Sequence, residues 1–183
     1  MAPHAKAAAR GLNNILVRHA HADDLLRVEE LLRECVQKMR ADGIDQWDDV
    51  YPTAATLTAD VAGGGLYVAS AEGLPVAGAF AIDERQEPEY AAVPWSVQAP
   101  RVAVVHRLMV HPRCQGRGLG PYLMRFAELR ARQLGYGAVR LDAFTSNPRS
   151  LRLYQRLGYL DAGPVTLRKG LFRCFEKDLA AAR

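Results

Sequence analysis

The sequence has few cysteines, little net charge and no long apolar run. Its three cysteines, Cys35, Cys114 and Cys174, are far apart and odd in number, so they predict neither a disulfide framework nor paired metal ligands. The formal net charge of +4 gives no reason to expect a nucleic-acid partner. No stretch approaches the roughly 20 apolar residues of a membrane span. We therefore expect a cytoplasmic protein without a metal ion that binds neither membranes nor nucleic acid.

The chain is long enough for one domain with a real core. Its 183 residues are 49% apolar and 24% charged, which is typical of a globular protein. The first residues, MAPHAKAAARGLNN, have little hydrophobicity and lack the apolar core of a signal peptide. We expect residues 1–12 to form a disordered leader and residues 13–183 to form a single domain.

The spacing of apolar residues alternates between strand-like and helix-like segments. Short β-rich runs predict strands at 15–20, 138–144 and 174–179, a hairpin at 66–82 and a central strand at 102–110. Amphipathic spacing and capping residues predict helices at 23–43, 53–65, 121–135 and 147–158. Prolines and acids mark 83–100 as a long loop. The pattern indicates an α/β or α+β domain with a mixed sheet.

The stretch HPRCQGRGLGPYLM, residues 111–124, places three glycines at alternate positions between a predicted strand and a helix. Helix N-termini expose unpaired N–H groups and attract anions, and glycines let the backbone approach an anion closely. Arg113, Gln115 and Arg117 add side-chain donors beside the loop. A tight strand-to-helix connection is the alternative interpretation. The spacing does not match a dinucleotide-binding fingerprint, so a dinucleotide oxidoreductase is disfavoured.

Two motifs together resemble the GCN5-related N-acetyltransferases (GNAT). Gln115-Gly116-Arg117-Gly118-Leu119-Gly120, after Leu108, Val110 and Pro112, resembles the family's acyl-CoA loop. NPRSLRLYQRLGY, residues 147–159, resembles the segment that closes the other side of the CoA site. The resemblance covers roughly residues 13–179. It implies the GNAT fold, with a mixed, mostly antiparallel sheet of six to seven strands and about four helices.

The resemblance implies acetyl-CoA as co-substrate and direct transfer of its acetyl group to an amine, without a covalent enzyme intermediate. The pyrophosphate would rest on the N–H groups of Gly116, Arg117, Gly118 and Gly120, with Gln115 bracing the turn. Pro121 has no N–H to donate. The arm would run along the end of the 102–110 strand. Arg113 and Arg117 would either meet phosphates or be solvated. The residues implied for acetyl-CoA are Leu108, Met109, Val110, Arg113, Gln115, Gly116, Arg117, Gly118, Leu119, Gly120 and Asn147.

Tyr154 and His106 are the candidate catalytic residues. In the family, a tyrosine at the position of Tyr154 protonates the departing thiolate, and the alternative is a packing tyrosine. His106 lies on the strand along which the arm runs, and alternation would put it on the same face as Leu108 and Val110. It could take the proton of the amine, although a structural histidine is the alternative.

The loops outside the two motifs carry the candidate acceptor residues. Trp47 and Tyr51 lie among acids in 42–51, and 83–89 adds further acids, so these loops could attract a cationic amine. A solvated loop anchored by Trp47 is the alternative. The expected acceptor is a small-molecule amine or a peptide N-terminus. A catalytically silent acyl-CoA-binding module is the alternative function, and a homodimer is possible for such a fold.

Overall fold

The computed structural model describes residues 12–71 and 73–180. The expected leader therefore lies outside the described residues except for Leu12, whose side chain is buried in the core. Within the described ranges, no helix is long and apolar enough to cross a membrane.

Seven strands form one sheet in the order β1-β2-β3-β4-β5-β7-β6. Their bounds are β1 Leu16–His19, β2 Leu66–Ala71, β3 Leu74–Asp83, β4 Val102–Val110, β5 Ala138–Phe144, β6 Leu160–Leu167 and β7 Gly170–Asp178. Neighbouring strands are antiparallel except for β4 and β5, which run parallel. The predicted fold class is confirmed, and the strand expected to be central is the middle one.

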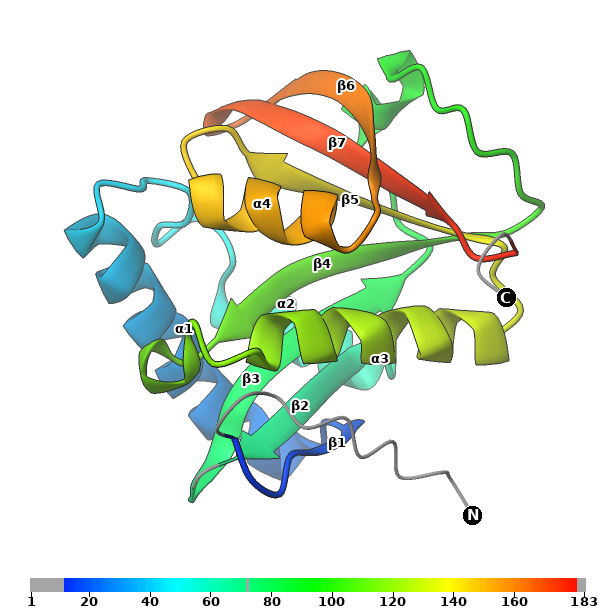
Figure 1. The fold of residues 1–183 in the computed structure, drawn as a ribbon. Helices are drawn as coiled ribbons and strands as arrows, with labels where there is room; N and C mark the ends of the chain where they lie inside the picture. The colour runs from blue at the N-terminus through cyan, green and yellow to red at the C-terminus, as the bar shows by residue number, and fades with distance from the viewer. Residues whose placement is uncertain (1–11, 72, 181–183) are drawn as a thin grey trace.

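Helices cover both faces of this sheet. They are α1 Leu25–Ala41, α2 Ala54–Ala62, α3 Leu119–Gln133 and α4 Pro148–Arg156. Figure 1 shows α3 and α4 in front of the sheet. Leu123 of α3 and Tyr154 of α4 belong to one buried cluster, whereas Val28 of α1 and Leu57 of α2 belong to another. The apolar stripes predicted from the sequence therefore face the two sides of one sheet.

The segment between β3 and β4 covers part of the sheet instead of extending into solvent. It contains a short 3₁₀ helix, η2, Pro88–Ala92, and its Tyr90 is buried in a third cluster with residues of β5, β6 and β7. Glu176 of β7, which is 1% exposed, accepts hydrogen bonds from the backbone N–H groups of Ser96 and Val97 at 2.8 and 3.0 Å. The loop predicted at 83–100 is thus attached to β7 by a buried carboxylate.

The sequence prediction missed β6 and the first part of β7. It placed one final strand at 174–179, whereas β6 and β7 form a hairpin. β6 contains Gly163 and Pro164, which weaken a strand signal. A strand at the edge of a sheet tolerates them because one side of its backbone needs no ladder partner. The helix predicted to start at 121 starts at Leu119, directly after Gly118, whose φ is 89°.

One extra residue interrupts the regular pairing of β4. His106 and Met109 of β4 lie opposite Ala81 and Ala79 of β3, so three steps along β4 match two steps along β3. Arg107, inside this interval, has a φ of 52°, which is rare for a residue with a side chain. The arrangement is a β-bulge, a feature that redirects side chains next to functional sites.

The bulge shifts the alternation of side chains along β4. Leu108 and Val110 pack against the cluster of α3 and α4, whereas Met109 packs against the cluster of α1 and α2. His106 is paired with Ala81, which belongs to the α1 and α2 cluster. The prediction that His106 shares a face with Leu108 and Val110 is therefore wrong, because simple alternation fails across Arg107.

β4 and β5 pair only at their beginnings. The ladder joins Val102–Val104 to Ala138–Arg140 and then stops, although both strands continue. Figure 1 shows the two arrows diverging toward their ends, with α4 beside β5. Beyond Val104, the edge of β4 that faces β5 has no strand partner within the described sheet. Backbone groups on this edge can therefore bind a ligand, except the carbonyl oxygen of Val110, which accepts from the side chains of Gln115 and Cys35.

Candidate functional site

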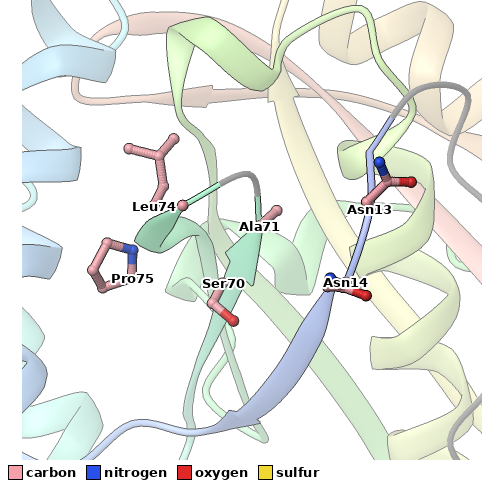
Figure 2. A pocket seen from close by; sticks show the side chains of 7 residues that line it. Asn13, Asn14, Ser70, Ala71, Leu74 and Pro75 are labelled. Atoms are coloured by element: carbon pink, nitrogen blue, oxygen red, sulfur yellow. The ribbon is translucent and has the colours of Figure 1, made fainter.

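A cavity of about 840 Å³ lies where β4 and β5 diverge. Residues 105–108 of β4, residues 142 and 143 of β5, the glycine loop and α4 all contribute to its wall. A second, open hollow of about 520 Å³ lies at the β2–β3 hairpin and the segment before β1 (Figure 2). The two share no lining residue, and the titratable side chains gather around the first.

The glycine loop forms one wall of the cavity, which we call the loop end (residues 115–121). Gly116 and Gly118 have φ values of 74° and 89°, so glycine is needed at both positions. A Cβ on Gly116 would meet no atom within 4 Å, so the loop leaves space beside its backbone. Among the described residues, no backbone carbonyl oxygen is seen to accept from the N–H groups of Gly116, Gly118, Leu119 and Gly120, whereas the N–H of Arg117, also expected to face the pyrophosphate, donates to the carbonyl oxygen of Cys114 at 3.4 Å.

These N–H groups fit the diphosphate of an acyl-CoA. They converge at the N-terminus of a 15-residue helix, where the helix dipole favours negative charge. Pro121 lies in the first turn of that helix and lines the cavity, as its missing N–H allows. When bound, acetyl-CoA supplies an activated thioester whose acyl group an amine can accept.

Gln115 connects the loop to the end of β4. Its Nε2 donates to the carbonyl oxygen of Val110 at 3.1 Å. Its Oε1 accepts a hydrogen bond at 3.1 Å from Arg149 of α4, whose guanidinium also contacts Asp42 at 3.1 Å. Arg149 lines the cavity and is a cation beside the loop that the sequence reasoning did not select.

The predicted acetyl-CoA residues divide into two groups. Those that line the cavity are Leu108, Val110, Gln115, Gly116, Gly118, Gly120 and Asn147. Met109 and Leu119 do not line it, because their side chains are buried in the core, which leaves only their backbone for a ligand. Arg113 is exposed outside the cavity lining, and Arg117 is also outside it.

Asn147 and Tyr154 are brought to the same cavity by α4. Asn147 caps this helix, because its Oδ1 accepts from the N–H of Ser150 at 3.3 Å, and its Nδ2 donates to Gln46 at 3.0 Å. Tyr154 is 6% exposed and packs against Tyr159 and Phe175. Burial, with a smaller contribution from the charge of Asp142, raises the pKa of Tyr154, so its phenol stays protonated.

His106 lines the cavity and contacts a carboxylate on its far side. Its Nε2 lies 3.1 Å from Oδ1 of Asp83. Burial opposes ionisation of Asp83, yet hydrogen bonds from His106 and Arg85 hold the pKa of that carboxyl well below its usual range. Asp83 therefore stays ionised and orients the imidazole. Within the described ranges, Nε2 of His106 makes the one hydrogen bond recorded for this imidazole, and Nδ1 has no hydrogen-bond partner.

The structure brings Trp47 and Tyr51 to the cavity with His106 and Asp142, and we call these four residues the acceptor end. Trp47 is 8% exposed and packs in the α1 and α2 cluster, as expected for an anchor of its loop. The hydroxyl of Tyr51 accepts a hydrogen bond from Arg107 at 2.7 Å.

Most acids of the two acidic loops are paired with bases. Asp45 and Asp48 bind Lys169 and Arg168 of the β6–β7 turn, and Glu84 binds Arg101. Asp42 contacts Lys38 and Arg149. These pairs reduce the negative charge that the loops can offer to a cationic amine. Glu87 and Glu89 line the cavity without a recorded ion pair among the described residues.

Sequence reasoning missed Arg107 and Asp142. Arg107 occupies the bulge of β4, and its guanidinium binds Asp60 of α2 at 2.6 Å, which is fully buried at its side chain. No local motif reveals this pair, because the two residues are far apart in the chain. Asp142 was visible as a carboxylate in the middle of the apolar run AVRLDAF. It is partly buried, lines the cavity and accepts a hydrogen bond from the hydroxyl of Tyr90 at 2.7 Å.

Neither a thiol nucleophile nor a metal site is evident among the described residues. Cys35 lines the cavity, and burial raises the pKa of its thiol to about 12, so it is not a thiolate at neutral pH. In the described part of the chain, no group of three or more His, Cys, Asp or Glu side chains could hold a metal ion.

Comparisons with known proteins identify the family and the fold of this chain. The model of the acetyltransferase (GNAT) family matches residues 26–159. A GNAT-family acetyltransferase from Streptococcus agalactiae superposes with a TM-score of 0.78 at 23% identity, over 91% of this chain and 96% of that chain. One from Listeria monocytogenes gives 0.72 at 23% identity, over 90% and 94%. The structure of yncA from Salmonella typhimurium with its cofactor acetyl-CoA gives 0.64 at 22% identity, over 91% and 95%. No curated protein sequence matches significantly.

Proposed function

Because the chain belongs to the acetyltransferase (GNAT) family, and is thus an acyltransferase, we propose that it moves an acetyl group from acetyl-CoA directly to a primary amine. The amine belongs to a small molecule or a peptide N-terminus. The observation that carries the proposal is the divergence of β4 from β5. It opens one cavity that has anion-binding amides at the loop end and both candidate proton-transfer side chains in its wall.

The unpaired edge of β4 has room for an extended arm between the two strands. Backbone groups near Leu108, Met109 and Val110 would bond to that arm as a neighbouring strand would. A backbone N–H of Met109 or Val110 would then polarise the thioester carbonyl of acetyl-CoA as negative charge develops on its oxygen. The β-bulge at Arg107 lies directly before this segment, in which Met109 and Val110 stay paired with β3 along the other edge of β4.

His106 would take the proton of the amine at Nδ1, directly or through water. Asp83 on the opposite nitrogen would stabilise the resulting imidazolium. Tyr154 would donate its phenolic proton to the leaving thiolate. Its raised pKa keeps the proton available at any physiological pH, although it makes the phenol a weaker acid than an exposed tyrosine.

Release of free CoA thiol tests the proposed function. We expect purified protein with acetyl-CoA to release thiol faster when an acceptor is present in a panel of polyamines, amino acids, aminoglycosides and peptides. Reactions without an acceptor give the background of hydrolysis. A protein that binds acetyl-CoA in calorimetry yet releases no extra thiol with any amine would be the silent binding module instead.

The pH dependence of kcat/KM tests the base. In wild-type protein the rate should fall as the base becomes protonated, and this limb should be lost in His106→Gln together with most of the rate. A limb that persists unchanged in His106→Gln would remove His106 from the mechanism.

A further inference from the structure

Asp142 is a carboxylate at the point where the sheet opens. The last paired residues of the β4–β5 ladder are Val104 and Arg140. Two residues further along each strand come His106 and Asp142, which alternation places on the same face as the pair before them. Both line the cavity. The two strands therefore present a base and an acid from opposite sides of the opening.

In the part of the chain that the structure describes, one oxygen of Asp142 is hydrogen-bonded. The hydroxyl of Tyr90 donates to Oδ2 at 2.7 Å, and Tyr90 itself is 2% exposed. Among the described residues, Oδ1 has no recorded hydrogen-bond partner and no cation forms an ion pair with the carboxylate. The fixed oxygen thus orients the carboxylate, while the second oxygen is left for a ligand.

Most cations that line the cavity are paired with other acids, whereas the exposed Arg156 of α4 has no recorded ion pair among the described residues. Arg107 binds Asp60, and Lys169 binds Asp45 and Asp48. The other groups that act on Asp142 are His106, which favours its ionised form, and Glu87, which opposes it. Burial raises the pKa of Asp142, the expected effect on a carboxylate that is removed from water without a cation. A cationic ligand would remove this cost.

The cavity wall near the acceptor end favours some cations over others. Trp47, Tyr51 and Phe172 give aromatic surface, whereas Glu87 and Glu89 add negative charge. A ligand with an ammonium group and an apolar body is attracted to such a wall. A carboxylate next to the ammonium would be repelled by Asp142 and the two glutamates.

We propose that the free oxygen of Asp142 binds the ammonium group of the acceptor, and that the acceptor is a primary amine with an apolar body and no neighbouring carboxylate. The inference rests on the proposed function. Asp142 holds the nitrogen beside His106, which then takes the proton, and no covalent bond to Asp142 forms. Tyr90 acts as the positioning residue for the carboxylate.

The test uses 2-phenylethylamine as probe, with 2-phenylethanol and phenylalanine as comparators. Each is titrated calorimetrically into CoA-saturated wild-type protein. We expect the amine to bind at least about tenfold more tightly than the alcohol, which lacks the charge, or the amino acid, which adds a carboxylate. In Asp142→Asn, which keeps the shape and an acceptor for Tyr90, the Kd and KM of the amine should rise about 10- to 100-fold. The Kd of acetyl-CoA should not change.

Asp161→Asn is the matched control, because Asp161 lies on β6, is paired with Arg173 and does not line the cavity. It should leave the Kd of both ligands unchanged. Equal binding of the amine and the alcohol to wild-type protein would overturn the inference. This comparison needs only wild-type protein, so it tests the inference even if Asp142→Asn does not fold. An unchanged amine Kd in folded Asp142→Asn would also overturn it. Acetylation of phenylalanine in preference to 2-phenylethylamine would overturn it while supporting the proposed function.

Discussion

The loop end of the cavity consists of backbone groups, whereas the acceptor end consists of side chains. The loop end is made of backbone from seven consecutive residues, 115–121, and its properties follow from glycines with positive φ and from a helix N-terminus. The acceptor end is made of side chains from the α1–α2 loop, β4 and β5, fixed by partners such as Asp83 and Tyr90. A local backbone motif can be recognised in a sequence. A site made of side chains from distant segments depends on where those segments meet in the fold.

The largest expected effect is on kcat in Tyr154→Phe, with the Kd of acetyl-CoA nearly unchanged. Tyr154→Phe removes the proton donor and keeps the aromatic packing against Tyr159 and Phe175. We expect kcat to fall about 100-fold, the usual contribution of a general acid, with little change in the Kd of acetyl-CoA. Steady-state rates and calorimetry on the same preparation measure both. An unchanged kcat would leave Tyr154 as a packing residue.

A matched glycine pair tests whether the loop end acts through its backbone. Gly116 and Gly73 both have a φ of 74°, and a Cβ on either would meet no atom within 4 Å. Substitution by alanine should therefore cost each variant the same 1–2 kcal/mol or so of left-handed backbone strain. Only Gly116→Ala should also weaken acetyl-CoA binding, by about tenfold, because its Cβ enters the space beside the amides. Equal acetyl-CoA affinities in the two variants would contradict a backbone site.

The sequence predicts most of the loop end but not the way in which the side chains of the acceptor end come together. The glycine loop, the Asn147 cap and the residue range of β5 follow from local rules of capping and strand propensity. The face of His106 was mispredicted because the bulge at Arg107 is a property of the β3–β4 register, which depends on non-local pairing.

The arrangement of the acceptor end could not be predicted from the sequence, because it too depends on non-local contacts. Asp142 was visible as a charge in an apolar run, but its partner Tyr90 lies 52 positions away in the chain. Asp60, the partner of Arg107, is 47 positions away. Contacts of this length are set by how the loop after β3 and the helix α2 pack on the sheet, and no short motif records them.

The loop that carries Tyr90 gives a third prediction. In Glu176→Gln, one buried oxygen that accepts from Ser96 or Val97 becomes an N–H₂ donor without an acceptor. The free energy of unfolding should fall by about 1–3 kcal/mol, measured by urea denaturation. Because the segment also positions Asp142, the KM of the amine should rise while the Kd of acetyl-CoA does not. A rise in both would show that the two ends are not independent.

The smallest expected effect concerns how the charge of Asp142 changes the thermal stability of the protein. The folded-state pKa of Asp142 is raised, so its ionised form opposes folding once the pH exceeds the value of about 3.9 for the unfolded chain. Asp142→Asn should therefore have a Tm equal to that of wild type near pH 3 and about 2–4 °C higher at pH 7. Thermal denaturation at both pH values measures this. A lower Tm at pH 7 would mean that the carboxylate stabilises the fold.

Direct transfer is tested most directly by following the acetyl group through a single turnover. Protein in excess over acetyl-CoA is mixed with an amine that supports thiol release, quenched at short times and analysed by mass spectrometry. We expect an N-acetylated amine that appears together with free CoA, about 100-fold more slowly in Tyr154→Phe, and no acetyl group on the protein at any time. An acetyl group that appears first on the protein, for example on Cys35, would contradict direct transfer within this cavity.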